Sequence, residues 1–298
     1  MMQTAQVPEH FNTPWHTAAA KGLFEAAGLQ VQWTDFPGGT GAMTKALRAG
    51  EVDVVLALTE GLVADLHRKP EYKLLGTYVS TPLTWGVHVR AENSRLQTMA
   101  DLDSAAARYA VSRKGSGSHL MACVDAHARG LDPRSLVLEV VGSLDGARKA
   151  LRDEEADVFM WEKFTTKFLV DAGEWRRIGE VPTPWACFSI AASDAALSES
   201  GDQLLTMLEI VKAEAKALRA SADCTKTIGL MYGQHEEDIR EWLTGVRWAC
   251  GPEVSHATLS QVMRALVDAA ILTEDDLLPP ASLVSGVTRD ADPDADAV

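Results

Sequence analysis

The sequence has little of several features that mark common classes of protein. It contains four cysteines in 298 residues, and none of them forms a CxxC pair or a Cys/His cluster. Isolated cysteines are typical of small buried apolar positions, so Cys123, Cys187, Cys224 and Cys250 predict neither a zinc site nor a disulfide framework. No apolar run approaches the ~20 residues of a membrane-spanning helix. We therefore expect no metal, no cofactor and no membrane insertion.

Positive charge is also scarce, with 28 Lys and Arg against 42 Asp and Glu and a net charge of -14. This balance argues against nucleic acid or an anionic membrane as the main partner, but not against a small anion at a local site. The first eight residues, Met1 to Pro8, contain neither a basic region nor an apolar core of a signal peptide. We expect a cytoplasmic protein if Met1 is the natural start, and a periplasmic one if it is not.

The remaining composition, with 46% hydrophobic and 23% charged residues, is typical of a globular protein with room for two lobes. The first eighty residues alternate strands and helices. Strands are predicted at 3–7, 29–36, 53–58 and 72–79, and helices at 13–27, at 42–49 and from 59. The same alternation resumes after residue 85, with a helix predicted at 162–172, and residues 194–270 are mostly helical. The pattern predicts an α/β fold with mainly parallel sheets.

Two breaks interrupt this alternation, at Ser80–Thr84 and at Pro182–Trp185. We interpret them as two crossings between lobes. They predict a discontinuous first lobe of residues 1–84 and 185–284 and a second lobe of residues 85–184. The acidic tail, 285–298, has no core-forming run and is expected to be disordered.

The loop from Ser112 to Met121 joins a short apolar run to a helical pattern. Its glycines and serines would offer backbone N–H groups and hydroxyls at a helix N-terminus, which suits a carboxylate, sulfonate or phosphate. The Lys precedes the glycines, so the loop is not a Walker loop. A tight turn with a serine N-cap and no ligand explains the pattern equally well.

An internal repeat supports two lobes of similar construction. Residues 45–54 (KALRAGEVDV) match residues 149–158 (KALRDEEADV) without gaps, and seven of the ten positions are identical. Each copy is predicted to be a helix, a turn and a buried strand. Ligands of open α/β sheets bind beyond the carboxyl ends of strands, so the residues after these strands become site candidates.

The order of elements resembles the type 2 periplasmic solute-binding proteins, most closely the nitrate, sulfonate and taurine binders with their thiamine-pyrimidine-synthase relatives. The resemblance rests on the stretches 8–14 (PEHFNTP), 37–41 (PGGTG), 46–54 and 111–118 (VSRKGSGS), and it covers roughly residues 3–270. The start of the chain resembles a subgroup of solute-binding-like proteins without export signals. The cysteine-rich iron-binding segment of the pyrimidine synthases has no counterpart here.

The resemblance implies two α/β lobes that close on a ligand bound in a cleft. By position, the first lobe would contribute His10, Phe11, Asn12, Thr13, Gly39, Thr40, Gly41, Thr59 and Glu60. The second would contribute Lys114, Ser116, Gly117, Ser118, His119, Trp161 and Glu162, and Trp85 and Trp185 near the crossings would stack on a flat ligand. Simpler roles remain open, because His10 can cap a helix, Trp161 can belong to the core, and Glu60 or Glu162 can interact favourably with a helix dipole.

These side chains predict a small polar ligand, anionic or zwitterionic, of the sulfonate, nitrate or pyrimidine class. The leading hypothesis is a non-catalytic solute-binding-like protein of the ABC-transporter type, although a permease partner is doubtful without an export signal. The alternative is a cytoplasmic enzyme of the thiamine-pyrimidine or menaquinone-precursor type, with His10, Glu60 or His119 as acid or base. A third hypothesis is a protein-binding module formed by the helical C-terminal third.

Overall fold

The computed structural model describes residues 1–103 and 106–298. The chain forms two compact units. Unit 1 comprises Met1–Pro82, Trp185–Val262 and Leu278–Val298, and unit 2 comprises Leu83–Pro184 and Met263–Leu277. The chain passes from one unit to the other within two residues of the predicted crossings. Met263–Leu277 differs from the prediction, since it was expected in the first lobe. Within unit 2, Asp268 Oδ2 of this segment lies 3.9 Å from His127 Nε2.

Unit 1 contains a six-stranded sheet in the order β11-β4-β10-β3-β1-β2. Its strands are β1 (Met2–Gln6), β2 (Val31–Asp35), β3 (Val54–Leu58), β4 (Tyr72–Val79), β10 (Phe188–Ser193) and β11 (Trp248–Gly251). Strand β1 is parallel to both β2 and β3, while β10 runs antiparallel to β3 and β4. The apolar stretch Val54–Leu58 forms the third parallel strand, and its first four residues are buried, as expected of a strand covered on both faces.

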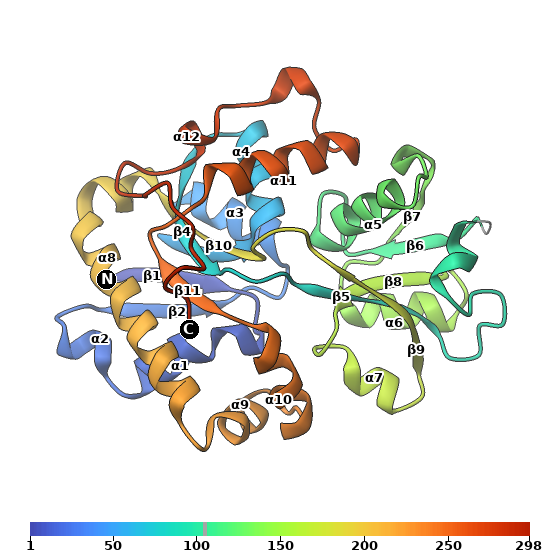
Figure 1. Cartoon of the computed structure of the whole chain (residues 1–298), viewed down its shortest axis with the longest axis horizontal. Helices are drawn as coiled ribbons and strands as arrows, with labels where there is room; N and C mark the ends of the chain where they lie inside the picture. Colours follow the sequence, from blue (N-terminus) through green and yellow to red (C-terminus); the bar gives the residue numbers. More distant parts are fainter. Residues whose placement is uncertain (104–105) are drawn as a thin grey trace. The chain divides into compact units, whose positions relative to one another are not determined.

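Helices cover both faces of this sheet (Figure 1). They are α1 (Thr13–Ala20), α2 (Leu23–Ala26), α3 (Thr40–Ala49), α4 (Thr59–Arg68), α8 (Asp194–Ala220), α9 (Cys224–Tyr232), α10 (Glu236–Gly245) and α12 (Pro280–Leu283), with the 3-10 turn η1 (His10–Asn12). α1 packs against α8, and α3 packs against α4 and β3. The expected single helix over 13–27 is wrong, because Gly22 adopts a left-handed conformation (φ 66°) that ends α1 and starts α2.

Unit 2 contains a five-stranded sheet in the order β7-β6-β8-β5-β9. Its strands are β5 (Thr84–Arg90), β6 (Arg108–Val111), β7 (Val137–Val140), β8 (Val158–Glu162) and β9 (Trp175–Pro182). Its helices are α5 (Gly117–Ala128), α6 (Leu144–Arg152) and α7 (Lys167–Asp171), with 3-10 turns η2 (Met99–Asp103), η3 (Pro133–Ser135) and η4 (Glu274–Asp276). Helix α11 (His256–Asp268) begins in unit 1 and ends in unit 2. In Figure 1, α5 and α6 lie on opposite faces of the unit 2 sheet.

The two units share a topology that the internal repeat predicts. In unit 1 the chain runs β1, α1, β2, α3, β3, and in unit 2 it runs β6, α5, β7, α6, β8. The first repeat copy covers the end of α3 and the start of β3, and the second covers the corresponding parts of α6 and β8. In both sheets the first strand lies between the second and the third, so the chain reverses direction there. These switch points, at β1 and β6, are where open α/β sheets bind ligands.

The acidic tail is ordered in the structure, contrary to the expectation for residues 285–298. Ser285 N donates to Leu74 O (2.9 Å), and Arg289 N donates to Pro252 O (2.8 Å). At the end of the tail, Trp248 and Val298 exchange backbone hydrogen bonds of 2.7 and 3.0 Å. Strand β11 is an edge strand, and its unpaired backbone groups explain why a chain without a core-forming run can still be held.

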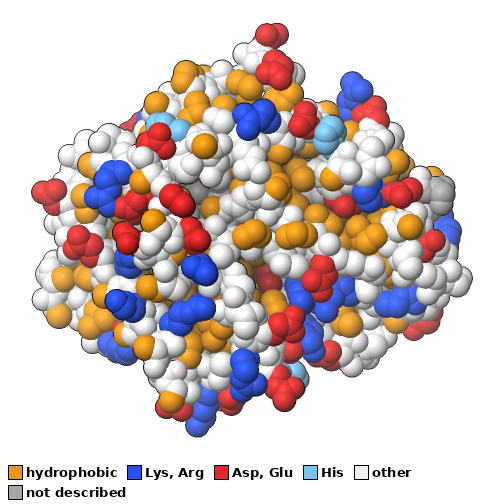
Figure 2. Space-filling model, viewed as in Figure 1, with side chains coloured by type: hydrophobic (Ala, Val, Ile, Leu, Met, Phe, Trp, Pro, Cys, Tyr) orange, Lys and Arg blue, Asp and Glu red, His pale blue; other side chains and the backbone are white. Residues whose placement is uncertain are grey.

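The charge distribution on the surface and the burial of the cysteines agree with what the composition predicts. Acidic and basic side chains are interspersed over the face seen in Figure 2. All four cysteines are free and buried, as predicted for isolated apolar positions. Over the part of the chain that the structure describes, no helix has the length and apolar character needed to cross a membrane.

Candidate functional site

The carboxyl edge of the unit 1 sheet gathers most of the residues predicted from the first lobe. The loops after β1, β2 and β3 all leave the sheet at this edge, because the three strands are parallel. The antiparallel neighbours bring Phe188, at the start of β10, and Val79, at the end of β4, to the same edge. His10, Thr40 and Glu60 therefore come from three consecutive loops of one sheet, as the pattern predicted.

His10 is buried in an aromatic environment directly after β1. Its ring lies 4.8 Å from the Phe11 ring and 4.3 Å from the Trp242 ring, between centroids. Burial lowers the pKa of His10 to about 3, so the imidazole is neutral at physiological pH. Its Nδ1 lies 3.4 Å from Gln234 Nε2, and its Nε2 is buried without a hydrogen-bond partner. The proposed role of His10 as a helix cap is not seen, because neither η1 nor α1 has a side-chain cap hydrogen bond.

Glu60 lies in the first turn of α4, directly after β3, and is completely buried. Trp185 Nε1 donates a 2.9 Å hydrogen bond to Glu60 Oε2, whereas Oε1 is buried without a partner. Burial raises the pKa of Glu60 to about 7, although hydrogen bonds from the Glu60 backbone and from Trp185 oppose the rise. Glu60 was predicted as a site residue from the end of a strand and Trp185 from a crossing between lobes, and the structure brings the two side chains into direct contact.

The other predicted residues of unit 1 are mostly committed to internal hydrogen bonds. Thr13 Oγ1 donates to His10 O (2.7 Å), and Asn12 Nδ2 donates to Val7 O (2.6 Å). Thr59 Oγ1 pairs with Ser189 Oγ at 2.9 Å. Phe11 contributes its carbonyl, which accepts hydrogen bonds from the side chains of Tyr78 and Trp248.

Gly39 and Gly41 frame the start of α3. Gly39 has a φ of 67° at the N-cap position, a conformation that disfavours residues with a side chain. Thr40 follows as the first residue of α3 and is buried. A Cβ added at Gly61, on α4, would lie 2.9 Å from Thr40 Cγ2, so α3 and α4 approach closely at this edge.

In unit 2, the predicted anion loop follows β6 and leads into α5, as expected. Its hydroxyls are used within the loop. Ser116 Oγ caps α5 by accepting from His119 N, and it lies 3.0 Å from Ser118 Oγ. Ser118 Oγ in turn accepts from Ser112 N at 3.0 Å. The geometry therefore has the serine N-cap that the simpler interpretation predicted.

The remaining loop residues differ in exposure. Lys114 is exposed, and Gly117 and His119 are half-buried. Gly115 N donates to His119 Nδ1 at 2.9 Å, which makes Nδ1 an acceptor and places the ring proton of a neutral His119 on Nε2. Burial lowers the pKa of the neighbouring Arg113.

Trp85, Trp161 and Glu162 lie together at the carboxyl edge of β8. Trp85 pairs with Glu162 across β5 and β8, and its ring centroid is 6.5 Å from that of Trp161. Trp85 is buried and its Nε1 has no hydrogen-bond partner. Trp161 packs against the unit 2 core cluster and stacks on Phe159, as the core interpretation predicted.

Glu162 ends β8 instead of starting a helix, so the predicted helix over 162–172 is wrong. Its Oε2 accepts hydrogen bonds from Phe164 N (3.0 Å), Thr165 N (2.6 Å) and Thr165 Oγ1 (2.7 Å). These bonds hold a turn after the strand, and α7 starts only at Lys167. Burial raises the pKa of Glu162, while the bonds from Thr165 lower it.

Sequence reasoning missed three polar or aromatic groups of the unit 1 edge. Gln6, the last residue of β1, is buried, and neither of its side-chain polar atoms has a hydrogen-bond partner. Gln234 and Trp242 reach His10 from the C-terminal helical region. A polar residue inside an apolar strand was the available signal for Gln6. The contacts of Gln234 and Trp242 could not be read from the sequence, because more than 220 positions separate them from His10.

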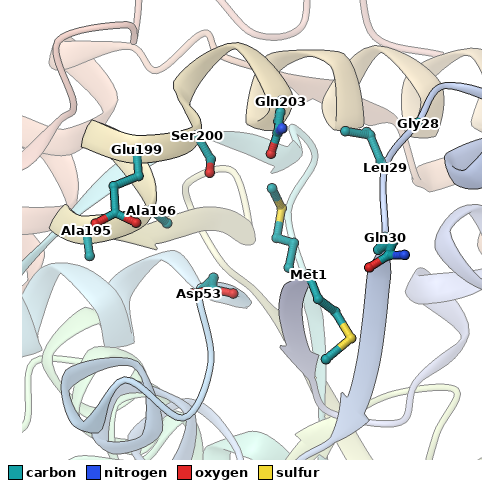
Figure 3. A pocket seen from close by; sticks show the side chains of 11 residues that line it. Met1, Gly28, Leu29, Gln30, Asp53, Ala195, Ala196, Glu199, Ser200 and Gln203 are labelled. Carbon is teal, nitrogen blue, oxygen red and sulfur yellow. The ribbon is translucent and has the colours of Figure 1, made fainter.

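Three cavities are lined by residues other than the predicted site residues. One of about 340 Å³ is lined by the amino ends of β1, β2 and β3 and by α8 (Figure 3), with Asp53, Glu199 and Gln203 among its residues. One of about 450 Å³ in unit 2 is lined by Arg90, Arg95 and residues near them. The third, of about 430 Å³, lies next to Lys216 and Arg219. Among residues 1–103 and 106–298, no group of three His, Cys, Asp or Glu side chains is arranged to hold a metal ion.

The fold is that of the type 2 periplasmic binding proteins. The Candida albicans CA3427 gene product, described as defining a family with the generic periplasmic binding protein fold, is 28% identical. Its structure matches with a TM-score of 0.88 over 96% of each chain. The alkanesulfonate-binding protein SsuA from Xanthomonas axonopodis pv. citri, solved bound to MOPS, has 17% identity and a TM-score of 0.77 over 94% of this chain and 96% of its own.

The periplasmic aliphatic sulphonate binding protein SsuA from Escherichia coli has 16% identity and a TM-score of 0.73, over 95% of this chain and 96% of its own. Residues 85–181, within unit 2, match the model of the Ca3427-like PBP family. No curated protein matches the sequence. The chain thus has the fold of the type 2 periplasmic-binding-protein superfamily, which confirms the resemblance at the level of the superfamily and the fold class predicted from the sequence.

Proposed function

We propose that the chain is a solute-binding-like protein that binds a small polar ligand at the carboxyl edges of its parallel strands and closes its two lobes on it. The observation that carries the proposal is the group of buried, unpartnered polar atoms at the unit 1 switch point. These atoms are Gln6 Nε2 and Oε1, His10 Nε2, Asn12 Oδ1 and Glu60 Oε1. A buried polar atom without a partner costs free energy, which a ligand supplying the missing hydrogen bonds would recover.

The proposed ligand class is anionic or zwitterionic, of the sulfonate, nitrate or pyrimidine type. Two of the most similar structures are sulfonate-binding proteins. In this chain, the helix N-terminus of α5 with Arg113 and Lys114 in the preceding loop supports an anionic group. The buried tryptophans Trp85 and Trp185 support a flat apolar part.

A thermal-shift screen tests this proposal with sulfonates, carboxylates, nitrate, amines and pyrimidines. A ligand at 100 times its dissociation constant stabilises the folded state by about 2.7 kcal/mol, which is readily measured. We expect one class to raise the unfolding temperature, to be recovered unchanged, and to reduce the radius of gyration in small-angle X-ray scattering. The proposal is wrong if no class binds, or if binding leaves the scattering unchanged.

An enzyme on the same fold is the second candidate, and the pKa of Glu60 favours it. A carboxyl group with a pKa of about 7 is suited to proton transfer at neutral pH. His10 is less suited, because burial holds its pKa near 3. Incubation of each binding compound with the protein, followed by proton NMR, separates the two functions. Consumption of the compound that Glu60→Gln abolishes would establish the enzyme.

A further inference from the structure

Glu60 is a buried carboxyl group of the unit 1 edge, and only one of its two oxygens has a hydrogen-bond partner in another side chain. Its Oε2 is held by Trp185 Nε1 at 2.9 Å, and this bond fixes the orientation of the carboxyl group. Its Oε1 is buried and has no hydrogen-bond partner. Because the side chain is completely buried, bulk solvent does not compensate this oxygen.

Three hydroxyl and amide groups of this edge already have partners, and the Gln6 amide, which has none, makes no hydrogen bond to Glu60. Thr59 pairs with Ser189, Thr13 donates to the His10 carbonyl, and Asn12 donates to the Val7 carbonyl. No group of the described chain bonds the Glu60 Oε1 atom, so a group of a bound ligand can satisfy it. That group must be a hydrogen-bond donor when the carboxyl is ionised.

The charge of the edge favours an N–H donor over an anion at this position. The loops that follow β1, β2 and β3 (residues 7–13, 36–41 and 59–60) contain two carboxylates, Glu9 and Glu60, and no Lys or Arg. A sulfonate or nitrate placed against Glu60 would meet a buried negative charge with no cation from these loops. An ammonium or amino group would instead form a charge-assisted hydrogen bond.

We propose that Glu60 is the specificity-determining residue of the unit 1 edge and that its Oε1 accepts a hydrogen bond from an N–H group of the ligand. The N–H group belongs to an ammonium or to an amino group on a heteroaromatic ring. The inference rests on the proposed function, since it assigns a ligand contact within that site. The inference restricts the ligand class to compounds that carry an N–H donor, with or without an anionic group elsewhere in the molecule.

The test uses two pairs of probes that differ only in this donor. Taurine is compared with ethanesulfonate, and 4-aminopyrimidine is compared with pyrimidine. Calorimetric titrations are run at about pH 8, where Glu60 is mostly ionised. We expect the amino member of one pair to bind the wild-type protein at least 10-fold more tightly than its partner, because the donorless compound leaves Glu60 unpaired. Discrimination within the taurine pair identifies an ammonium ligand, and discrimination within the pyrimidine pair identifies a ring amine.

Glu60→Gln is the diagnostic variant, and Glu51→Gln, at an exposed position of the same unit, is its control. The Gln amide keeps an acceptor for Trp185 and puts an N–H donor where Oε1 lies. We expect Glu60→Gln to remove the discrimination by weakening only the amino compound, and Glu51→Gln to retain it. Circular dichroism confirms that each variant is folded.

Three results would overturn the Glu60 inference and leave the proposed function standing: equal binding of both members to the wild-type protein, equal weakening of both by Glu60→Gln, or discrimination that survives this variant. Because the first is measured on the wild-type protein, it does not depend on the variant folding. Absence of binding by all four probes up to about 10 mM would reject both the inference and the proposed sulfonate and pyrimidine classes.

Discussion

Replacement of Glu60 by Gln should change how the stability of the protein depends on pH. Glu60 has a pKa of about 7 in the folded protein and 4.5 as its ordinary value, because burial disfavours the carboxylate. Between these two pH values the unfolded chain releases a proton that the folded chain retains. The contribution of Glu60 to the free energy of unfolding therefore falls as pH rises from 4.5 to 7, and the loss is complete above pH 7.

The size of the effect follows from the shift. One pKa unit corresponds to about 1.4 kcal/mol, so a rise from 4.5 to about 7 corresponds to about 3 kcal/mol. Glutamine carries no titrating proton and keeps an oxygen that accepts from Trp185. We expect the difference in unfolding free energy, Glu60→Gln minus wild type, to increase by about 3 kcal/mol between pH 4 and pH 8.5.

Urea titrations followed by circular dichroism at several pH values measure this difference. His10 acts in the opposite direction in both proteins. Burial lowers its pKa from 6.5 to about 3, so its contribution is present above pH 6.5 and is lost as pH falls toward 3. It cancels in the difference. Glu51→Gln, at an exposed carboxylate, should follow the wild-type pH profile. If the stability of the wild-type protein and of Glu60→Gln depended on pH in the same way, the interpretation of Glu60 as a buried group that retains its proton would be refuted.

Other substitutions test the packing and the turns. Gly61→Ala should lower the free energy of unfolding by about 1–3 kcal/mol in urea titrations, because the added Cβ would lie 2.9 Å from Thr40 Cγ2. The second substitution Thr40→Ser should restore the lost stability. An equal cost of Gly61→Ala with and without Thr40→Ser would contradict this contact. Asp157→Asn should cost about 2 kcal/mol at pH 7, since Asp157 accepts two hydrogen bonds from the Arg108 side chain. These bonds lower the pKa of Asp157, so the cost should disappear as pH falls below its ordinary value of 3.8, and a cost that stays constant would exclude the ion pair. Glu162→Ala should lower the free energy of unfolding by about 2 kcal/mol, because it removes the hydrogen-bond acceptor of the turn after β8, and Glu162→Gln should lower it less. Equal losses of stability for the two variants in thermal unfolding would show that the carboxamide oxygen cannot hold the turn.

Local patterns in the sequence were sufficient to predict most of the elements and the fold class. The apolar run Asp53–Leu58, the glycine turn before α3 and the repeat at 149–158 each specify a structure through nearest neighbours. The crossings near Pro82 and Trp185 were also predictable, because prolines interrupt the alternation of strands and helices there.

Other elements were not predictable because their stability comes from distant parts of the chain. Strand β11 is a four-residue run that becomes a strand by pairing with β4. Residues 285–298 are held by backbone bonds to β4 and β11 and by side-chain bonds, such as the one from Thr288 Oγ1 to Leu74 O. The turn at Glu162 replaced a predicted helix because a buried carboxylate satisfied the backbone N–H groups that follow it.

The candidate site was likewise predictable only in part from local sequence patterns. The sequence by itself determined which loops of the sheets carry His10, Thr40, Glu60 and Ser116, because parallel strands deliver the residues that follow them to one edge. Only the tertiary structure decided which polar atoms are already paired. It placed the Trp185 indole on Glu60 and the Gln234 amide beside His10, and it engaged Ser116 within its own loop. Hydrogen bonds and burial depend on contacts across the chain, and these contacts turn a list of polar residues into a site with particular unpaired atoms.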